Sequence, residues 1–237
     1  EDRPTVIETP RFFRFMAAAL NPPGPFEKVA KEALYYVTPV DPTWPAEQAE
    51  EWLRTLNYAL LRMIAVHECY PGHFVHFLHV RYKVASPVRK SHFSFAFTEG
   101  WAHYCEEMMI QEGLGDRDPR LRVAQLQDAL LRDCRYISSI RMHVFGWSWE
   151  EATRFFMENA FLEHLPAERE AKRGTFDPGY LNYTLGKLMI KKLRTDWMAR
   201  HTGASLREFH DAFLGLGAPP LGLAREALLG PDAGPAL

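Results

Sequence analysis

The stretch that decides how this chain is understood is Met63-Ile64-Ala65-Val66-His67-Glu68-Cys69-Tyr70-Pro71-Gly72-His73. An apolar helical run ends in the pair His67-Glu68, and a proline–glycine break precedes the second histidine, His73. Zinc hydrolases bind the ion through neutral imidazoles and use a nearby carboxylate to deprotonate the bound water. The residue types therefore indicate a metal site built around this stretch.

The spacing of the two histidines requires a break in the helix. In the common His-Glu-x-x-His pattern the histidines are four positions apart and share one helix face. From His67 to His73 a straight helix would turn through roughly 240°, at about 100° per residue, and would point the rings apart. Proline cannot continue the helical hydrogen bonds, and glycine tolerates distorted dihedrals. Pro71-Gly72 therefore predicts a local unwinding that returns His73 to the side of His67.

A third ligand is expected on the next helix. A zinc ion held by two histidines needs a further protein ligand, which in many such enzymes is a glutamate. Glu99, His103 and Glu106 lie at i, i+4 and i+7 and share one helix face. Glu99 leads that face at the start of the helix, so it is the predicted third ligand.

Composition bounds the class of protein. The chain has 237 residues and 47% hydrophobic content, enough for one domain with a full core. The net charge is −2 and no basic run stands out, which argues against nucleic acid or an anionic membrane surface as the main partner. No apolar stretch approaches the ~20 residues that span a bilayer. The sparse cysteines, Cys69, Cys105 and Cys134, indicate reduced thiols, so we predict a cytoplasmic location.

Two regions follow from the local signals. Residues 1–45 are rich in proline and predict an irregular arm, in which Glu32–Val37 is a short helix or, preferably, a strand. Residues 46–237 predict a helical metal-binding catalytic domain, so the fold class is mainly α. The expected helices run from Pro45 to about Glu68, 72 to 83, 98 to 112, 119 to 144 and 178 to beyond 194, with capping boxes at Ser148-x-x-Glu151 and Ser205-x-x-Glu208.

The ordered motifs resemble the C-terminal half of a known family, the bacterial domain of unknown function 885, which is grouped with zincin-like metallopeptidases. The resemblance is carried in order by these positions: His67, Glu68, Pro71, Gly72 and His73; Glu99, Gly100, Trp101, Ala102, Tyr104 and Glu106; Arg132, Arg135, His143, Gly146 and Trp147; Pro178, Gly179, Tyr183, Gly186 and Arg194; Phe209, His210, Asp211, Gly217 and Pro219. The match covers about residues 60 to 222.

The resemblance implies a largely helical gluzincin-like fold, one zinc on His67, His73 and Glu99, and Glu68 as general base. Family members are typically about twice this length, so the chain is expected to be a fragment or a short relative. It could then associate with a missing N-terminal half or with a second copy of itself. Ser139, Tyr180 and His103 depart from the family pattern, in which aspartate, glutamine and an aliphatic residue are expected.

Further polar residues are candidates for the site. His143 and Tyr183 could donate hydrogen bonds to the oxyanion that develops on a scissile carbonyl. Arg135 and Arg194 could hold a substrate carboxylate in bidentate geometry. For each of these four residues the alternative is a structural hydrogen bond or ion pair.

Three more histidines have open roles. His103 is expected to be a core residue or to support the ligand Glu99, rather than to be a fourth ligand. His76 and His79 could extend a metal cluster, but such histidines more often line a helix face. The cofactor prediction is one zinc ion per chain.

These observations predict a zinc-dependent hydrolase that cleaves amide or peptide bonds by a metal-activated water, with Glu68 as general base. Its substrate would be a peptide or a small amide. Two rival functions remain at this point. One is a metal-binding scaffold domain without catalysis, and the other is a carboxylate-bridged di-metal helical protein that uses Glu99, His103, Glu106 and the His73/His76 pair.

Overall fold

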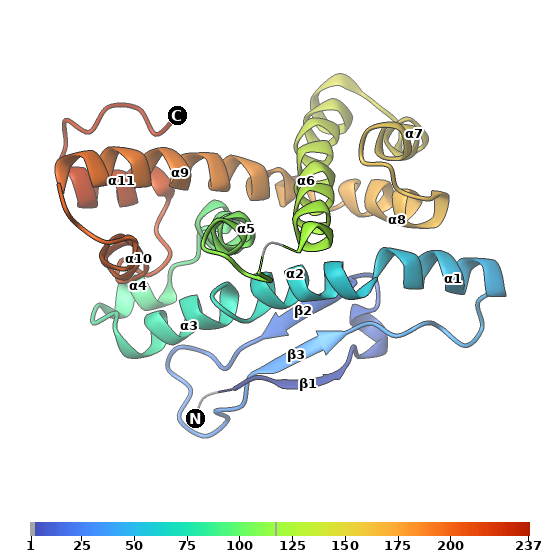
Figure 1. Ribbon diagram of the computed structural model, residues 1–237, viewed down its shortest axis with the longest axis horizontal. Helices are drawn as coiled ribbons and strands as arrows, with labels where there is room; N and C mark the ends of the chain where they lie inside the picture. The colour runs from blue at the N-terminus through green and yellow to red at the C-terminus, as the bar shows by residue number, and fades with distance from the viewer. Residues whose placement is uncertain (1–2, 117) are drawn as a thin grey trace.

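The computed structural model describes residues 3–116 and 118–237, so the first two residues of the expected arm, Glu1 and Asp2, lie outside it. The fold is mainly helical with a small N-terminal sheet, which confirms the predicted fold class. Figure 1 shows the strands below helices α2 (Tyr58–Glu68) and α3 (His73–Tyr82), with α5 (Phe95–Gln111), α6 (Pro119–Phe145) and α9 (Asn182–Arg200) on the opposite side of these two helices.

The N-terminal arm holds three short strands rather than the single one expected. These are β1 (Thr5–Glu8), β2 (Ala18–Asn21) and β3 (Leu34–Val37), and a short 3-10 helix, η1 (Arg11–Phe13), lies between β1 and β2. β3 is central, parallel to β1 and antiparallel to β2. The strand interpretation of the segment ending at Val37 is therefore confirmed. Prolines keep each strand short, because they cannot donate to a ladder and break the segments between strands.

The helices follow the sequence signals closely. They are α1 (Ala46–Thr55), α2 (Tyr58–Glu68), α3 (His73–Tyr82), α4 (Pro87–Ser91), α5 (Phe95–Gln111), α6 (Pro119–Phe145), α7 (Trp149–Asn159), α8 (His164–Gly174), η2 (Pro178–Leu181), α9 (Asn182–Arg200), α10 (Leu206–Leu214) and α11 (Leu221–Leu229). Both capping boxes form. The helix expected from Pro45 to Glu68 is instead two, because Asn57 accepts from the N–H groups of Ala59 and Leu60 and starts α2 anew.

The break between α2 and α3 forms where Pro71-Gly72 predicts it. α2 ends at Glu68 and α3 begins at His73. The Gly72 N–H donates to the Val66 carbonyl at 3.0 Å, so the loop folds back on the end of α2. A Cβ on Gly72 would lie 1.8 Å from the His67 carbonyl oxygen, and only glycine fits this approach.

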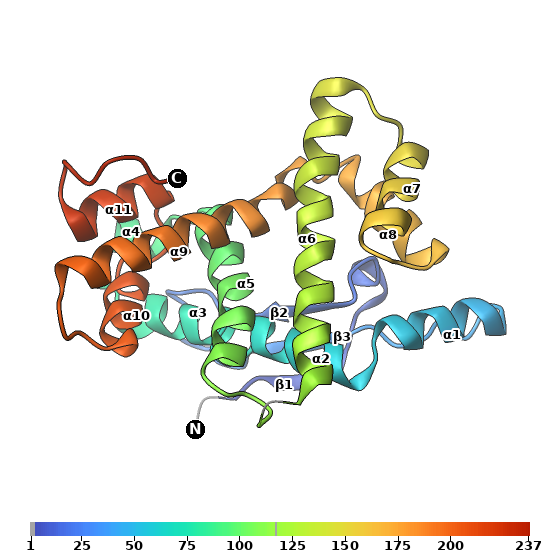
Figure 2. The same ribbon diagram turned by 45° about the horizontal axis from the view of Figure 1, so that its top comes forward.

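Two hydrophobic clusters form the core, and the long helix α6 stands between them (Figure 2). The larger cluster joins α2 and α5 to α9, α10 and α11 through residues such as Trp101, Ile190 and Phe213. The smaller one joins α6 to α7, α8 and η2 around Phe156 and Tyr180. None of the helices in the described part of the chain is long and apolar enough to cross a membrane. The three cysteines are buried and unpaired.

Candidate metal centre

Three side chains from three helices converge at the α2–α3 break. His67 comes from the last turn of α2, His73 from the first turn of α3, and Glu99 from the second turn of α5. One ligand atom from each of the three lies within 4.8 Å of the others. Glu99 Oε2 is 3.4 Å from His67 Nε2 and 3.3 Å from His73 Nε2. The structure therefore brings together the three residues that the spacing predicts.

The contacts among these atoms suit a cation at their centre. Glu99 Oε2 is buried and has no hydrogen-bond partner, so its contacts with the two imidazoles lack hydrogen-bond geometry. A buried carboxylate oxygen without a partner is costly. Two imidazole nitrogens and one carboxylate oxygen are the ligand set of many zinc hydrolases, with the remaining position open to water or substrate. The donor set fits zinc.

Burial and charge act in opposite directions in this group. Burial alone would lower the pKa of His67, but the carboxylates of Glu106 and Glu99 raise it to about 9. Burial would raise the pKa of Glu99, but the charges of His73 and His67 hold it well below its usual range. The carboxylate of Glu99 is thus held in its charged form between two imidazole rings, where a bound cation would also stabilise it.

Glu106 orients the imidazole of His67 from behind. His67 Nδ1 lies 2.6 Å from Glu106 Oε1, a contact that fixes the ring so that Nε2 faces Glu99. Glu106 also receives contacts from His103 Nδ1 and Arg132 Nη2, each at 3.1 Å. Arg132 pairs in turn with Asp128. Burial would raise the pKa of Glu106, but Arg132 and His103 hold it well below its usual range.

Glu68 occupies the position after His67 and turns toward the N-terminal sheet. Its Oε2 accepts the backbone N–H of Leu20 in β2 at 2.8 Å. Leu20 is opposite Tyr35 in the antiparallel pair with β3, and Thr38 N–H donates to the carbonyl of Ala17. This alternation directs the polar groups of Ala18 and Leu20 away from β3, toward the free edge of the sheet.

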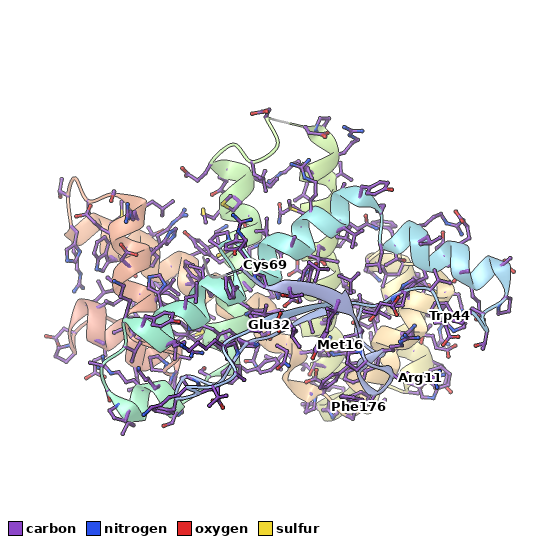
Figure 3. All side chains as sticks on the ribbon, turned by 90° about the horizontal axis from the view of Figure 1, so that it is seen from below. Arg11, Met16, Glu32, Trp44, Cys69 and Phe176 are labelled. Carbon is purple, nitrogen blue, oxygen red and sulfur yellow. The ribbon has the colours of Figure 1, made fainter. Side chains whose placement is uncertain are left out.

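A cavity of about 390 Å³ connects these parts. It is lined by the metal-site residues and Glu68, by Ala17 to Leu20 of β2, and by residues of α1, α6 and α8. Seen from below, the strands pass between the α1–α2 side and the side of α8 and Phe176 (Figure 3). The metal centre therefore opens onto a cleft with one wall made by an edge strand.

Two of the other predicted site residues reach this cavity. The ring of Tyr183 stacks on that of His67 with centroids 6.0 Å apart, and burial, with the nearby charge of Glu99, raises the pKa of its phenol to about 12. Arg135 also lines the cavity, where its Nε and Nη2 donate to the two oxygens of Glu170, each at 2.7 Å.

The structure does not bring His143 and Arg194 to the cavity lining. His143 Nε2 contacts the Gly174 carbonyl at 2.8 Å. Arg194 Nη1 donates to the hydroxyl of Tyr104 at 2.9 Å, and this hydroxyl lies 2.9 Å from His210 Nε2. His143 thus joins α6 to α8, and Arg194 joins α9 to α5.

The three histidines whose roles the sequence left open also have defined contacts. His76 contacts the Gly217 carbonyl at 2.9 Å, and His79 lies 3.5 Å from Asp211. His103 supports Glu106 rather than the ligand Glu99. The described residues contain one group of this kind that could hold a metal ion, at His67, His73 and Glu99.

Sequence reasoning missed three contributors to the site. The roles of Glu106 and of the Leu20 backbone depend on contacts across 39 and 48 positions of the chain. Arg173 lines the cavity from α8, and no local pattern distinguishes it from a surface arginine. For Glu106 two signals were available: its i+7 spacing from Glu99, which places both carboxylates on the same helix face, and its place in the family motif.

The fold and the site together define a mainly helical protein with a buried His-His-Glu group that could hold a metal ion. The chain belongs to the family described as bacterial protein of unknown function, DUF885, which it matches over residues 1–228. This confirms the resemblance to DUF885 itself and extends the match to the N-terminal sheet.

Two of the solved structures that match this chain show the same fold. One is a putative lipoprotein of unknown function from Shewanella oneidensis, with a TM-score of 0.82 and 30% identity over 96% of this chain and 40% of that one. The other is a putative lipoprotein from Colwellia psychrerythraea, with a TM-score of 0.84 and 25% identity over 95% of this chain and 37% of that one. The chain thus spans about two-fifths of the length of each. No curated protein matched it.

Proposed function

We propose that this chain carries the catalytic centre of a zinc-dependent hydrolase that cleaves amide bonds in peptides. The observation that carries the proposal is the partnerless oxygen of Glu99, held between the Nε2 atoms of His67 and His73 beside a cavity. Bound there, zinc would act as a Lewis acid and lower the pKa of a water molecule. His67, His73 and Glu99 would hold one ion.

Glu68 is the proposed general base. It follows the ligand His67 directly, lines the same cavity, and has one oxygen fixed by the Leu20 N–H. Its carboxylate would accept a proton from the attacking water and pass it to the leaving nitrogen. The hydrogen bond from β2 would keep the carboxylate aimed into the cavity during both transfers.

Tyr183 is the proposed donor to the carbonyl oxygen of the substrate as negative charge develops on it. The ring lies against His67 and the residue lines the cavity. A hydrogen bond that strengthens as the charge develops stabilises the transition state more than the ground state. His143 and Arg194 are given no role in this mechanism, because they lie outside the cavity lining.

The edge of β2 supports a peptide as the substrate. The outward polar groups of Ala18 and the carbonyl of Leu20 face the free edge, and both residues line the cavity. An extended peptide can pair with such an edge through main-chain hydrogen bonds that do not depend on its sequence. A small amide without an extended backbone would gain nothing from this strand.

The proposal is tested with Glu68→Gln. We expect zinc content equal to that of the wild type and a loss of turnover on a broad peptide library of about 10²- to 10⁴-fold, because proton transfer loses its base. Turnover would be followed by mass spectrometry of the products. If the variant retains full activity, the role of Glu68 is wrong. If a folded, zinc-loaded wild type cleaves no peptide, the chain is a metal-binding scaffold without catalysis.

A further inference from the structure

One face of α8 forms the wall of the cavity opposite α2. Pro166, Arg169, Glu170 and Arg173 all line the cavity, and their spacing of i, i+3, i+4 and i+7 places them on a single helix face. Two of the four carry a positive charge. No part of the mechanism above uses them.

The arginines that line the cavity differ in whether a carboxylate forms an ion pair with them. Arg132 is paired with Glu106 and Asp128, and Arg135 with Glu170. Arg169 has no carboxylate within ion-pair distance in the described part of the chain, and its guanidinium lies 4.7 Å from the ring centre of Trp52. It donates one hydrogen bond, to the Arg14 carbonyl. A partly buried guanidinium without an ion-paired carboxylate is energetically unfavourable, and a negatively charged ligand would stabilise it.

Arg173 lies on the same face of α8, one turn after Arg169. Its Nε and Nη2 both donate to a single oxygen of Asp177, at 3.0 and 2.9 Å, and Nη2 lies 3.5 Å from the Tyr183 hydroxyl. Nη1 has no partner among the described residues, so one side of the planar fork is open. Tyr183 in turn stacks on His67, so a single side chain separates Arg173 from the metal ligands.

The length of the cavity limits how many residues of a peptide fit between the arginines of α8 and the metal centre. The cavity includes α2 from Leu60 to His67. At about 1.5 Å rise per residue these seven steps cover roughly 10 Å, and an extended peptide covers that distance in about three residues.

Strand β2 fixes the direction of such a peptide. Its N-terminal end lies near Arg169. The guanidinium of Arg169 lies over the ring of Trp52, whose indole N–H donates to the Thr38 carbonyl. The Thr38 hydroxyl in turn donates to the carbonyl of Met16, just before β2. Its Leu20 end lies at Glu68. A peptide that has its carboxyl end at α8 and its scissile bond at Glu68 therefore runs antiparallel to β2.

We propose that Arg173 and Arg169 bind the free C-terminal carboxylate of the substrate, so that the enzyme is an exopeptidase that releases segments of up to about three residues from the carboxyl end. The cleavage rests on the proposed hydrolase function, and the binding of the carboxylate does not. A side-chain carboxylate has the same chemistry, so the test must distinguish the two sources.

The test compares three N-acetylated alanine–leucine hexapeptides with the zinc-loaded protein: a free acid, the matching amide, and the amide with glutamate at its fifth position. We expect the free acid to be cut within three residues of its end, with kcat/KM at least 10-fold above both amides. Arg173→Gln should bring the three rates together, mainly through a higher KM for the acid. The matched control is Lys172→Gln, on the same helix but outside the cavity lining, which should keep the preference.

Other outcomes overturn the inference without touching the hydrolase. Equal cleavage of acid and amide, or cuts at internal positions, would show that the protein does not recognise the terminal carboxylate. Fast cleavage of the glutamate amide would show that the arginines bind a side-chain carboxylate instead. If no peptide is cut, calorimetry of the N-acetyl-Ala-Ala-Leu acid and amide still decides: tighter binding of the acid that is lost in Arg173→Gln supports the carboxylate site, and equal or undetectable binding refutes it.

Discussion

Glu106 shows how a residue that touches no substrate can govern the centre. Its carboxylate fixes the ring of His67 through a 2.6 Å contact and is itself held by His103 and Arg132. The partner behind a metal-binding histidine sets which nitrogen carries the proton, and with it the direction of the lone pair. The metal affinity of this centre should therefore depend on Glu106.

We predict that Glu106→Gln weakens zinc binding about 10- to 100-fold, because the amide holds the imidazole less firmly than a carboxylate. Competition with a chromophoric chelator measures the affinity. Glu112→Gln, an exposed position just after the same helix, is the control and should bind zinc like the wild type. A thermal unfolding curve shows that each variant is folded. An unchanged affinity in Glu106→Gln would mean that Glu106 is only a structural partner.

The three residues of the possible metal site could be predicted at this scale because each is marked by short-range sequence signals. His67, His73 and Glu99 stand at breaks or starts of helices, where spacing alone constrains geometry. The supporting residues could not be predicted in the same way. His143 and Arg194 have the chemistry expected of a site, but the helix packing turns them toward Gly174 and Tyr104 instead.

At the scale of elements, the break between α2 and α3 brings His67 and His73 together. A side chain on Gly72 would collide with the His67 carbonyl and must separate the two helices. We predict that Gly72→Ala destabilises the protein by more than about 2 kcal/mol and abolishes metal binding. Urea unfolding and elemental analysis measure the two effects. Gly222→Ala in α11, where a Cβ would meet nothing within 4 Å, should leave both unchanged or slightly raise stability.

The packing of α5 on α9 gives a second prediction, on pH. Burial would raise the pKa of Glu107, but ion pairs with Lys187 and Lys191 lower it to about 2. A lowered carboxyl pKa contributes stability above the unfolded value, about 4.5, and loses it as the pH falls toward about 2. Glu107→Gln should therefore cost about 1 kcal/mol at pH 7, and the difference should vanish near pH 2. A constant difference across this range in urea titrations would refute the account.

Elements were predictable where their ends carry chemical signals. The capping boxes at Ser148 and Ser205 and the stop at Gly146 gave helices close to those observed. The three-stranded sheet was not predicted, because its pairing joins segments from residues 5 to 37 and no single segment alternates clearly enough to reveal it. The restart of α2 at Asn57 was missed, because the apolar period continues across it.

For the whole molecule, the site lies where separately packed parts meet. α5 belongs to the larger hydrophobic cluster, α8 to the smaller one, and β2 to the sheet, yet all three line the cavity. Contacts such as Leu20 with Glu68 and Arg135 with Glu170 join distant parts of the chain. No sequence pattern determines such contacts, so the cavity and the arginines of α8 that line it became visible only in three dimensions.

The central claim is that His67, His73 and Glu99 hold one zinc ion, and metal content measures it most directly. Elemental analysis of the purified, folded protein after zinc is offered should give one zinc per chain. His67→Ala, checked for folding by circular dichroism, should give almost none. A folded wild type that takes up no zinc, or a His67→Ala variant that keeps a full equivalent, would contradict the account.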